Sequence, residues 1–319
     1  MLPDRLLSYV VTLLLSVYIL TFLIGLPTNI LSLCTFCIKV YNKPMPTDIL
    51  LLNLTVSDLL FLLVLPLKMH EVASHMKWSL PYALCPVTYF VFFSTIYTSS
   101  LLLMAVSVDR YLGVAFPVRY RLLKKPLYAA VACVGIWVIS SAHCSIVFIV
   151  EHLSLGNDTL DTTVCYENFT EEQLNILLPV RLEFFVVIFL APLLICTFCY
   201  LSCIRILSAQ SRICHKKKKK AIGMALGTLL VFVICFLPYN SSHVFGYVKG
   251  KSPPWRDYTL LLSTFNTCLD PIIFYFSSST FQTMVKYFML KIVRLRNLIL
   301  RSERLSNVTT NTENIRQEN

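Results

Sequence analysis

Seven apolar stretches, each about the length that a bilayer requires, constrain this chain more than any other feature. An α-helix rises about 1.5 Å per residue, so about 20 apolar residues cross a hydrocarbon core of about 30 Å. The chain is therefore predicted to be an all-α membrane protein, a seven-transmembrane helix bundle. The predicted spans are Tyr9–Ile38, Asp48–Ala73, Tyr82–Val114, Leu127–Val150, Leu178–Leu207, Ala221–Val248 and Tyr258–Ser277.

The composition agrees with a membrane environment. Only 14% of the 319 residues are charged, whereas about a quarter are charged in soluble domains. The net charge is +11, but the basic residues lie mainly in the connections, so we expect them to face lipid headgroups and a cytoplasmic partner, not nucleic acid. The positive-inside rule predicts an extracellular amino terminus, because the outer face then holds few of the 28 Lys and Arg residues: Arg5, Lys68, Lys77, Arg181, Lys249, Lys251 and Arg256.

The two ends of the chain carry separate predictions. The first apolar stretch is long enough to span, so we expect a transmembrane helix and not a cleavable signal peptide. We expect the membrane domain to cover residues 1–297 and residues 298–319 to form a disordered cytoplasmic tail. After the seventh span, a short amphipathic helix on the inner membrane surface is predicted by apolar residues at helical spacing: Phe281, Val285, Phe288 and Ile292.

Two cysteines, Cys85 and Cys165, fall in outer connections or at an outer helix end. Because the outside is oxidising, a disulfide between them is predicted, with two free thiols as the alternative. Sequons at Asn157 and Asn168 lie on the same side and predict glycosylation. The cysteines show no metal-ligand spacing.

Polar residues inside the spans predict an internal site. Asp58 and Asp270 place carboxylates in the second and seventh spans, and Ser99 and Asn266 add hydroxyl and amide oxygens. These oxygens predict a small-cation site, for a bound sodium ion, or a shared proton. A hydrogen-bonded polar core without an ion is the alternative, and no other cofactor is expected.

Basic and aromatic residues gather near the outer ends of three spans. Arg181 begins the fifth span, Arg256 opens the seventh, and Tyr239, Asn240 and His243 lie in the sixth. Tyr239 and His243 are four residues apart, so they share a helix face. Two arginines and a histidine from three helices predict an anion site, because Arg pairs bidentately with carboxylates. The alternatives are a snorkelling arginine at 181 and a plain loop residue at 256.

Short motifs, in order along the spans, resemble those of the rhodopsin-like G-protein-coupled receptors. They are Gly25–Asn29, Leu54–Asp58, Asp109–Tyr111, Trp137, Pro192 with Tyr200, Cys235–Pro238 and Asp270–Phe274. The resemblance implies a plasma-membrane receptor in which an outer ligand moves the sixth helix and opens a crevice beside Arg110. It implies coupling to heterotrimeric G proteins through Asp109, Arg110 and Tyr111, with arrestins and membrane lipids as further partners. The chain departs from the family pattern at three positions, with Phe236 for Trp, Asp270 for Asn and Phe274 for Tyr.

Longer segments are similar to a narrower group, the free fatty acid receptors, and in particular to those that respond to short-chain carboxylates. They are Arg110–Val118, Ala142–Cys144, Cys165–Thr170, Leu178–Glu183, Pro238–Asn240 with His243, and Asp270–Pro271 with Phe274–Ser278. The resemblance implies that Arg181 and Arg256 clamp a carboxylate and that His243 and Tyr239 assist them.

Further site residues are implied by the same resemblance. His143 is expected to line the pocket, and Glu167 is expected to pair with an arginine when the site is empty. Phe93 stands where the short-chain receptors carry Tyr, one turn above Tyr97. The missing hydroxyl changes the polarity of the pocket and bears on the preferred chain length.

These observations predict a receptor activated by acetate, propionate and butyrate. A nearby alternative is a receptor for another small anion, such as a hydroxy acid or a nucleotide, which would also require arginines. A transporter is a more distant alternative, because the chain shows no inverted repeat and no pair of broken helices. An enzyme is not expected, since the His and acidic residues show neither zinc-type nor nucleophile spacing.

Overall fold

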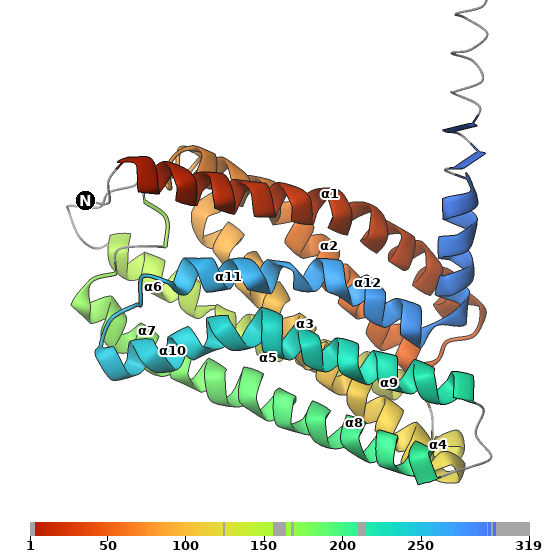
Figure 1. The fold of residues 1–319 in the computed structure, drawn as a ribbon. Coiled ribbons are helices and arrows are strands. Elements are labelled where there is room, and N and C mark those ends of the chain that lie inside the picture. Colours follow the sequence, from red (N-terminus) through yellow and green to blue (C-terminus); the bar gives the residue numbers. More distant parts are fainter. Residues whose placement is uncertain are drawn as a thin grey trace, which may run out of the picture. The chain divides into compact units, whose positions relative to one another are not determined.

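The computed structural model describes residues 4–123, 125–155, 164–166, 169–209, 215–291, 293–294 and 296–297. The chain divides into two compact units, Met1–Ser277 and Ser278–Asn319. Figure 1 shows the first unit as a bundle of long helices running side by side. Three predicted site residues, Asn157, Glu167 and Asn168, lie outside the described residues, as does Ile292.

The described residues include seven helices long and apolar enough to cross a membrane, as predicted. The first three spans are formed by single helices and the last four by consecutive helical segments. In order they are α1 (Asp4–Asn42), α2 (Pro46–Ala73), α3 (Leu84–Ala115), α5 (Pro126–Cys144) with α6 (Ile146–Leu155), α7 (Glu171–Glu183) with η1 (Phe184–Leu190) and α8 (Ala191–Ala209), α9 (His215–Leu230) with η2 (Val231–Phe236) and α10 (Leu237–Lys249), and α11 (Arg256–Thr264) with α12 (Asn266–Ser277).

The third span lies at the centre of the bundle. Most of α3 is buried, and it packs against α2, α5 and α8. Much less of α1 is buried, and its exposed side chains include large apolar ones such as Leu23. Such a surface suits a helix whose solvent is lipid, because hydrocarbon accepts apolar side chains at no cost.

Two spans contain a π-helical segment just before a proline. η1 ends at Leu190, two residues before Pro192, and η2 ends at Phe236, two residues before Pro238. A proline lacks the N–H and its ring crowds the carbonyl four residues back. The backbone widens in response, so that the Ala191 and Leu237 N–H groups bond to carbonyls five residues back.

The boundaries of two spans differ from the prediction. The fifth span begins at Glu171 and not at Leu178, because the Thr170 side chain accepts from the Gln173 N–H while the Gln173 side chain accepts from the Thr170 N–H. This capping box starts the helix about two turns earlier than hydropathy indicates.

The fourth span is interrupted at Ser145 between α5 and α6. A further helix, α4 (Pro117–Leu123), lies in the connection after α3.

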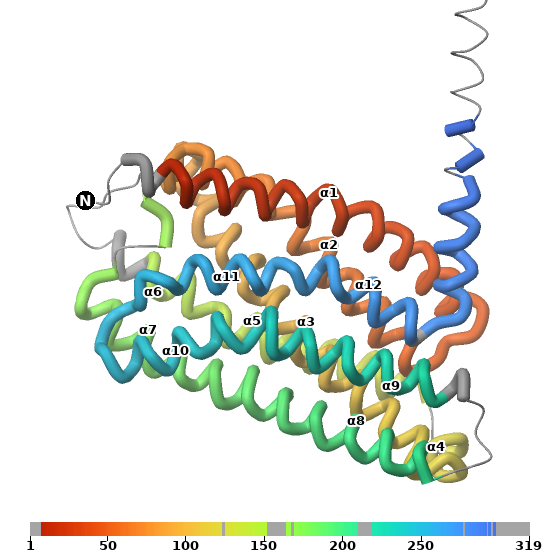
Figure 2. Tube along the Cα trace, in the orientation of Figure 1, coloured from red at the N-terminus to blue at the C-terminus, as the bar shows by residue number. Residues whose placement is uncertain are grey.

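The two ends of the bundle are distinct. The beginning of α1 lies at the same end as α6, α7 and the last turns of α10, while α4 and the start of α9 lie at the opposite end (Figure 2). This arrangement agrees with the predicted assignment of outer and inner connections. In the second unit, residues 279–291 are helical, and the Phe281 N–H bonds to the Ser278 hydroxyl at 3.2 Å, so the helix predicted after the seventh span is confirmed.

Candidate ligand site

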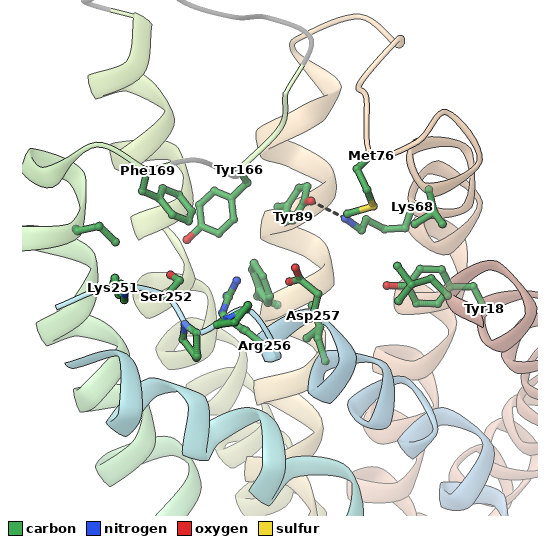
Figure 3. A pocket seen from close by; sticks show the side chains of 17 residues that line it. Tyr18, Lys68, Met76, Tyr89, Tyr166, Phe169, Lys251, Ser252, Arg256 and Asp257 are labelled. Atoms are coloured by element: carbon green, nitrogen blue, oxygen red, sulfur yellow. Dashed lines mark hydrogen bonds between the residues drawn. The ribbon is translucent and has the colours of Figure 1, made fainter. Parts of the chain in front are cut away.

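Two cavities share a wall at the outer end of the bundle. The first, which we call the arginine cavity, has a volume of about 10 Å³ and is lined by Phe93, Tyr97, Cys144, Ile146, Val147, Tyr166, Leu177, Arg181, Phe184, Tyr239, His243 and Arg256. The second, which we call the vestibule, has a volume of about 380 Å³ (Figure 3). Phe93, Tyr166 and Arg256 line both. The arginine cavity holds about one water molecule, so a ligand must widen it.

Arg256 is held against two aromatic rings. It is the first residue of α11, and its Nη2 donates to the Tyr239 hydroxyl at 2.8 Å. Its guanidinium carbon lies 5.8 Å from the Phe93 ring centroid and 5.3 Å from that of Tyr239, within cation–π range. The side chain is 8% exposed, and its Nε has no hydrogen-bond partner among the described residues.

Arg181 approaches the same cavity from α7. Its Nη1 donates to the Ser252 hydroxyl at 2.8 Å, and its guanidinium carbon lies 5.2 Å from the Phe169 ring centroid. Only 3% of the residue is exposed, yet Nη2 has no hydrogen-bond partner in the described part of the chain. A snorkelling arginine would reach water or headgroups, so the buried position contradicts that alternative.

His243 and Tyr97 complete the polar lining. The Tyr97 hydroxyl lies 3.0 Å from His243 Nε2, whereas Nδ1 has no partner within the described residues. The His243 ring also packs edge-on against Tyr239, with centroids 4.8 Å apart. Asn240 is buried on the same helix but lines neither cavity, and its Nδ2 donates to the Phe236 carbonyl at 2.9 Å.

The electrostatic character of this site is strongly positive. Neither Arg181 nor Arg256 forms an ion pair with any acid that the structure describes. Two guanidinium groups thus lie buried beside one small cavity with donors unpaired. Buried charges are normally paired, because removing them from water is costly. The predicted pairing with Glu167 involves a residue outside the described part of the chain.

His143 does not take the predicted position in the pocket. It lies on α5, its Nδ1 faces the Ile139 carbonyl at 2.8 Å, and its Nε2 lies 3.1 Å from Glu183. It lines neither cavity. Its ring is 5.9 Å from that of Phe184, which does line the arginine cavity. His143 therefore reaches the site only through Phe184, because its helix face points toward Glu183.

The vestibule contains a buried ion pair that the sequence analysis did not single out. Lys68 is 4% exposed and Glu71 is 2% exposed. Lys68 Nζ donates to Glu71 at 2.5 Å and to the Tyr89 hydroxyl at 2.6 Å. Figure 3 shows Lys68 bonded to Tyr89, whose ring lies beside that of Tyr166. The sequence did contain a signal for this pair, because a Lys and a Glu lie three residues apart inside an apolar span. Charged residues within spans usually have a structural or functional role.

The predicted disulfide between Cys85 and Cys165 is confirmed, with their Cα atoms 5.8 Å apart. It ties the beginning of α3 to the segment that precedes Tyr166. Because Tyr166 lines both cavities, the disulfide helps to place this residue over the site.

The predicted polar core lies deeper in the bundle. Asp58 and Asp270 are buried and interact through their side chains. Asp58 Oδ2, both Asp270 oxygens and Asn266 Oδ1 have no hydrogen-bond partner among the described residues, while Ser99 donates to Ser57 at 3.1 Å. Unpaired oxygens of this kind fit a hard cation. They also fit one proton held between the two carboxyl groups.

The inner end of α3 is anchored to its neighbours. Asp109 accepts from Tyr120 of α4 at 2.7 Å and from Thr47 of α2. Burial and the Asp109 carboxylate raise the pKa of Tyr120, so its hydroxyl stays a donor. Arg110 lines an inner cavity of about 150 Å³. Tyr111 packs near Phe198 of α8, with ring centroids 5.6 Å apart.

Comparison with known proteins agrees with this arrangement. The seven-transmembrane receptor (rhodopsin family) model matches residues 28–274. Free fatty acid receptor 3 of Mus musculus is 49% identical over 268 residues, which cover 84% of this chain and 83% of that receptor. For Homo sapiens, receptor 3 is 48% identical over 270 residues (84% and 77%), and receptor 2 is 46% identical over 282 residues (88% and 84%).

The identities of the human receptors 3 and 2 to this chain, 48% and 46%, are similar. The helix bundle, the disulfide and these relatives agree on one assignment. The chain therefore belongs to the rhodopsin family of G-protein-coupled receptors and, within it, to the free fatty acid receptors.

Proposed function

We infer that this receptor is activated by short-chain fatty acids, namely acetate, propionate and butyrate. Their carboxylate is held by Arg181 and Arg256 in the arginine cavity. Tyr239 and His243 orient the bound group, and the signal leaves through Asp109, Arg110 and Tyr111 to heterotrimeric G proteins.

The observation that carries this proposal is the pair of buried guanidinium groups without an ion-pair partner among the described residues. An arginine cannot shed its proton at physiological pH, so its charge must be balanced from outside the side chain. A carboxylate supplies two acceptor oxygens for the free N–H groups of Arg181 and Arg256. The remaining walls, including Ile146, Val147 and Leu177, suit a short alkyl chain.

The small cavity sets the expected size and affinity of the ligand. A space of about 10 Å³ widens less for acetate or propionate than for a longer acid. A short acid has little apolar surface, so charge-assisted hydrogen bonds supply most of the affinity. We expect a Kd near or above the micromolar range.

The site is connected to the sixth span at a point suited to movement. Tyr239 and His243 follow Pro238 directly, and the π-helical segment η2 precedes it. A bound carboxylate competes with the Tyr239 hydroxyl as acceptor for the Arg256 guanidinium, and it also interacts with His243. Each change acts on α10 beside a backbone that is already distorted, where a pivot requires the least rearrangement.

The test measures G-protein activation in cells against acetate, propionate, butyrate and longer acids. The variants Arg181→Ala and Arg256→Ala are compared with Lys249→Ala, which removes an exposed outer cation that lines neither cavity. We expect the short acids to activate the wild type and the Lys249→Ala receptor, and both arginine variants to be silent at equal surface expression. A wild type that ignores every acid at tens of millimolar would refute the ligand assignment.

A larger anion is the second candidate, and the vestibule favours it. This cavity is far larger than the arginine cavity, shares Arg256 with it, and adds Lys68 and Lys251. A hydroxy acid or nucleotide could place its charge on Arg256 and its body in the vestibule. Including these anions in the same panel, with Lys68→Ala as a variant, separates the two candidates.

The proposal extends to the setting of the receptor. We expect it in the plasma membrane with an extracellular amino terminus, glycosylated at Asn157 and Asn168, and in contact with arrestins and membrane lipids. The polar core of Asp58, Ser99, Asn266 and Asp270 would hold a sodium ion or a shared proton, and its oxygens would act by binding that cation or proton between the second and seventh spans.

A further inference from the structure

Three side chains separate the vestibule from the arginine cavity. Phe93 comes from α3 and Arg256 from the first position of α11, so both belong to helices. Tyr166 comes from an irregular segment, immediately after Cys165. Among these three, Tyr166 is therefore the side chain whose position depends least on a helix.

Tyr166 is nevertheless tightly packed. It is 6% exposed, and its ring centroid lies 5.2 Å from that of Tyr89, 5.7 Å from Phe93 and 5.0 Å from Phe169. Figure 3 shows it beside Phe169 and above Ser252 and Arg256. Burial raises the pKa of its phenol, against the nearby charges of Arg181 and Arg256, so the hydroxyl remains neutral. The ring therefore stands between the two cavities as a neutral barrier.

The backbone of Tyr166 requires support. Its φ of 52° lies in the left-handed region, which is unfavourable for a bulky residue. The disulfide fixes the preceding Cys165 but leaves the backbone at Tyr166 free to rotate away from this conformation. Another interaction must hold the ring over the site.

Glu151 supplies that interaction from α6. Its Oε1 accepts from the Tyr166 N–H at 3.0 Å, and its Oε2 accepts from the Tyr82 hydroxyl at 2.5 Å. The carboxylate is buried, so both bonds are charge-assisted and shielded from water. The pKa of Tyr82 is raised by burial and by Glu151, which keeps its hydroxyl a donor. One carboxylate thus joins α6, the segment before α3 and the residue that covers the site.

We propose that Glu151 is a positioning residue that holds Tyr166 as a barrier between the vestibule and the arginine cavity, and thereby controls the rate at which small anions pass from one to the other. This inference deepens the proposed function and rests on it only for the identity of the anion. An incoming acid first enters the open vestibule and reaches Arg181 only when Tyr166 moves. Breaking the Glu151 bonds increases the fraction of time in which Tyr166 is displaced.

Cys144 offers a direct readout of passage. It is a buried free thiol that lines the arginine cavity and not the vestibule. A small, negatively charged, membrane-impermeant methanethiosulfonate added outside intact cells labels Cys144 only after crossing the barrier. The rate of labelling is taken as the difference between each receptor and its Cys144→Ser counterpart. This measurement needs no agonist, so it remains valid if the fatty acid assignment fails.

We expect Tyr166→Ala to be labelled at least tenfold faster than the wild type, because it removes the ring that forms the barrier. We expect Glu151→Ala to be labelled about tenfold faster, since loss of the charge-assisted hydrogen bond to the Tyr166 N–H shifts a two-state equilibrium by about that factor. Tyr166→Phe keeps the ring and is expected to match the wild type. Glu151→Gln keeps an acceptor for the Tyr166 N–H and is expected to recover most of the slow rate. Tyr82→Phe removes only one bond and should give a small increase.

Each outcome bears on the proposal. If Tyr166→Ala leaves labelling unchanged, Tyr166 is not the barrier. If Tyr166→Ala accelerates labelling but surface-expressed Glu151→Ala does not, Glu151 does not position it. Should Glu151→Ala fail to reach the surface, Tyr82→Phe decides: a wild-type rate overturns the role of Glu151, and a small increase supports it.

Discussion

The outer arginine cavity and the inner polar core both bury two like charges, but they differ in how the charge can be relieved. Arg181 and Arg256 remain protonated whatever their surroundings, so their charge has to be balanced by an anion. Asp58 and Asp270 can share one proton or hold one cation between them. The outer site therefore favours an anionic partner, whereas the carboxyl groups of the inner site can also lower their own charge by taking up a proton.

A third pair of buried charges, in the second span, differs from both. Lys68 and Glu71 are as deeply buried as the arginines, yet they neutralise each other within one helix. The same bundle thus holds a pair of cations, a pair of acids and a pair of opposite charges. Substitutions that remove or neutralise one member of a pair test whether charge balance determines what each pair does.

The largest effect is expected from removing one of the two outer cations. Arg256→Ala should weaken the response to propionate by roughly 30- to 4,000-fold, since truncating one partner of a buried charged pair costs about 2–5 kcal/mol. Arg256→Lys retains the charge but not the planar fork, so an intermediate loss is expected. Dose–response curves at matched surface expression measure both, and equal losses in the two variants would assign the effect to geometry and not to charge.

An effect of comparable size should follow from unpairing Lys68. Glu71→Gln leaves a lone buried cation and should lower the free energy of unfolding by about 3–5 kcal/mol. Thermal unfolding of the purified receptor measures this loss. Lys39→Ala is the matched control, because the Lys39–Asp48 pair is more exposed and its removal should cost far less. The double variant Lys68→Met with Glu71→Gln should recover most of the stability, and a double variant as unstable as the single one would contradict the explanation by charge balance.

A smaller effect is expected at the inner core. If Asp58 and Asp270 hold sodium, choline can be replaced by sodium at a concentration about ten times the Kd for sodium. This exchange should raise the free energy of unfolding of the wild type by about 1.4 kcal/mol. Asp58→Asn and Asp270→Asn should each abolish that difference. A wild type that is equally stable in both salts would instead favour the shared proton.

The smallest effect concerns the polarity of the cavity wall between the two outer sites. Phe93→Tyr adds one hydroxyl close to Arg256. One additional hydrogen bond is worth about 0.5–1.5 kcal/mol, which corresponds to a change of roughly 2- to 12-fold in potency. We expect the change to favour acetate over butyrate. Tyr97→Phe, which removes the hydroxyl 3.0 Å from His243, is the control, and it should lower the potency of both acids alike.

The spans and the disulfide could be predicted from the sequence alone. Hydrocarbon selects apolar helices so strongly that hydropathy identifies them without any tertiary information. The two arginines of the outer site were also identifiable, because each is a charge at the end of an apolar helix. Local chemistry even contained the true start of the fifth span, in the Thr170–Gln173 capping box, although hydropathy placed it later.

The tertiary structure alone decided which side chains face each other. His143 was expected in the pocket but faces Glu183. Lys68 counted only as an outer charge, yet it is buried beside Glu71 and Tyr89. Glu151 was not predicted as a site residue, and only the packing of α6 against Tyr82 and Tyr166 gives it two partners. The membrane fixes where a helix lies along its normal, whereas the rotation of each helix depends on contacts with neighbours far away in the sequence.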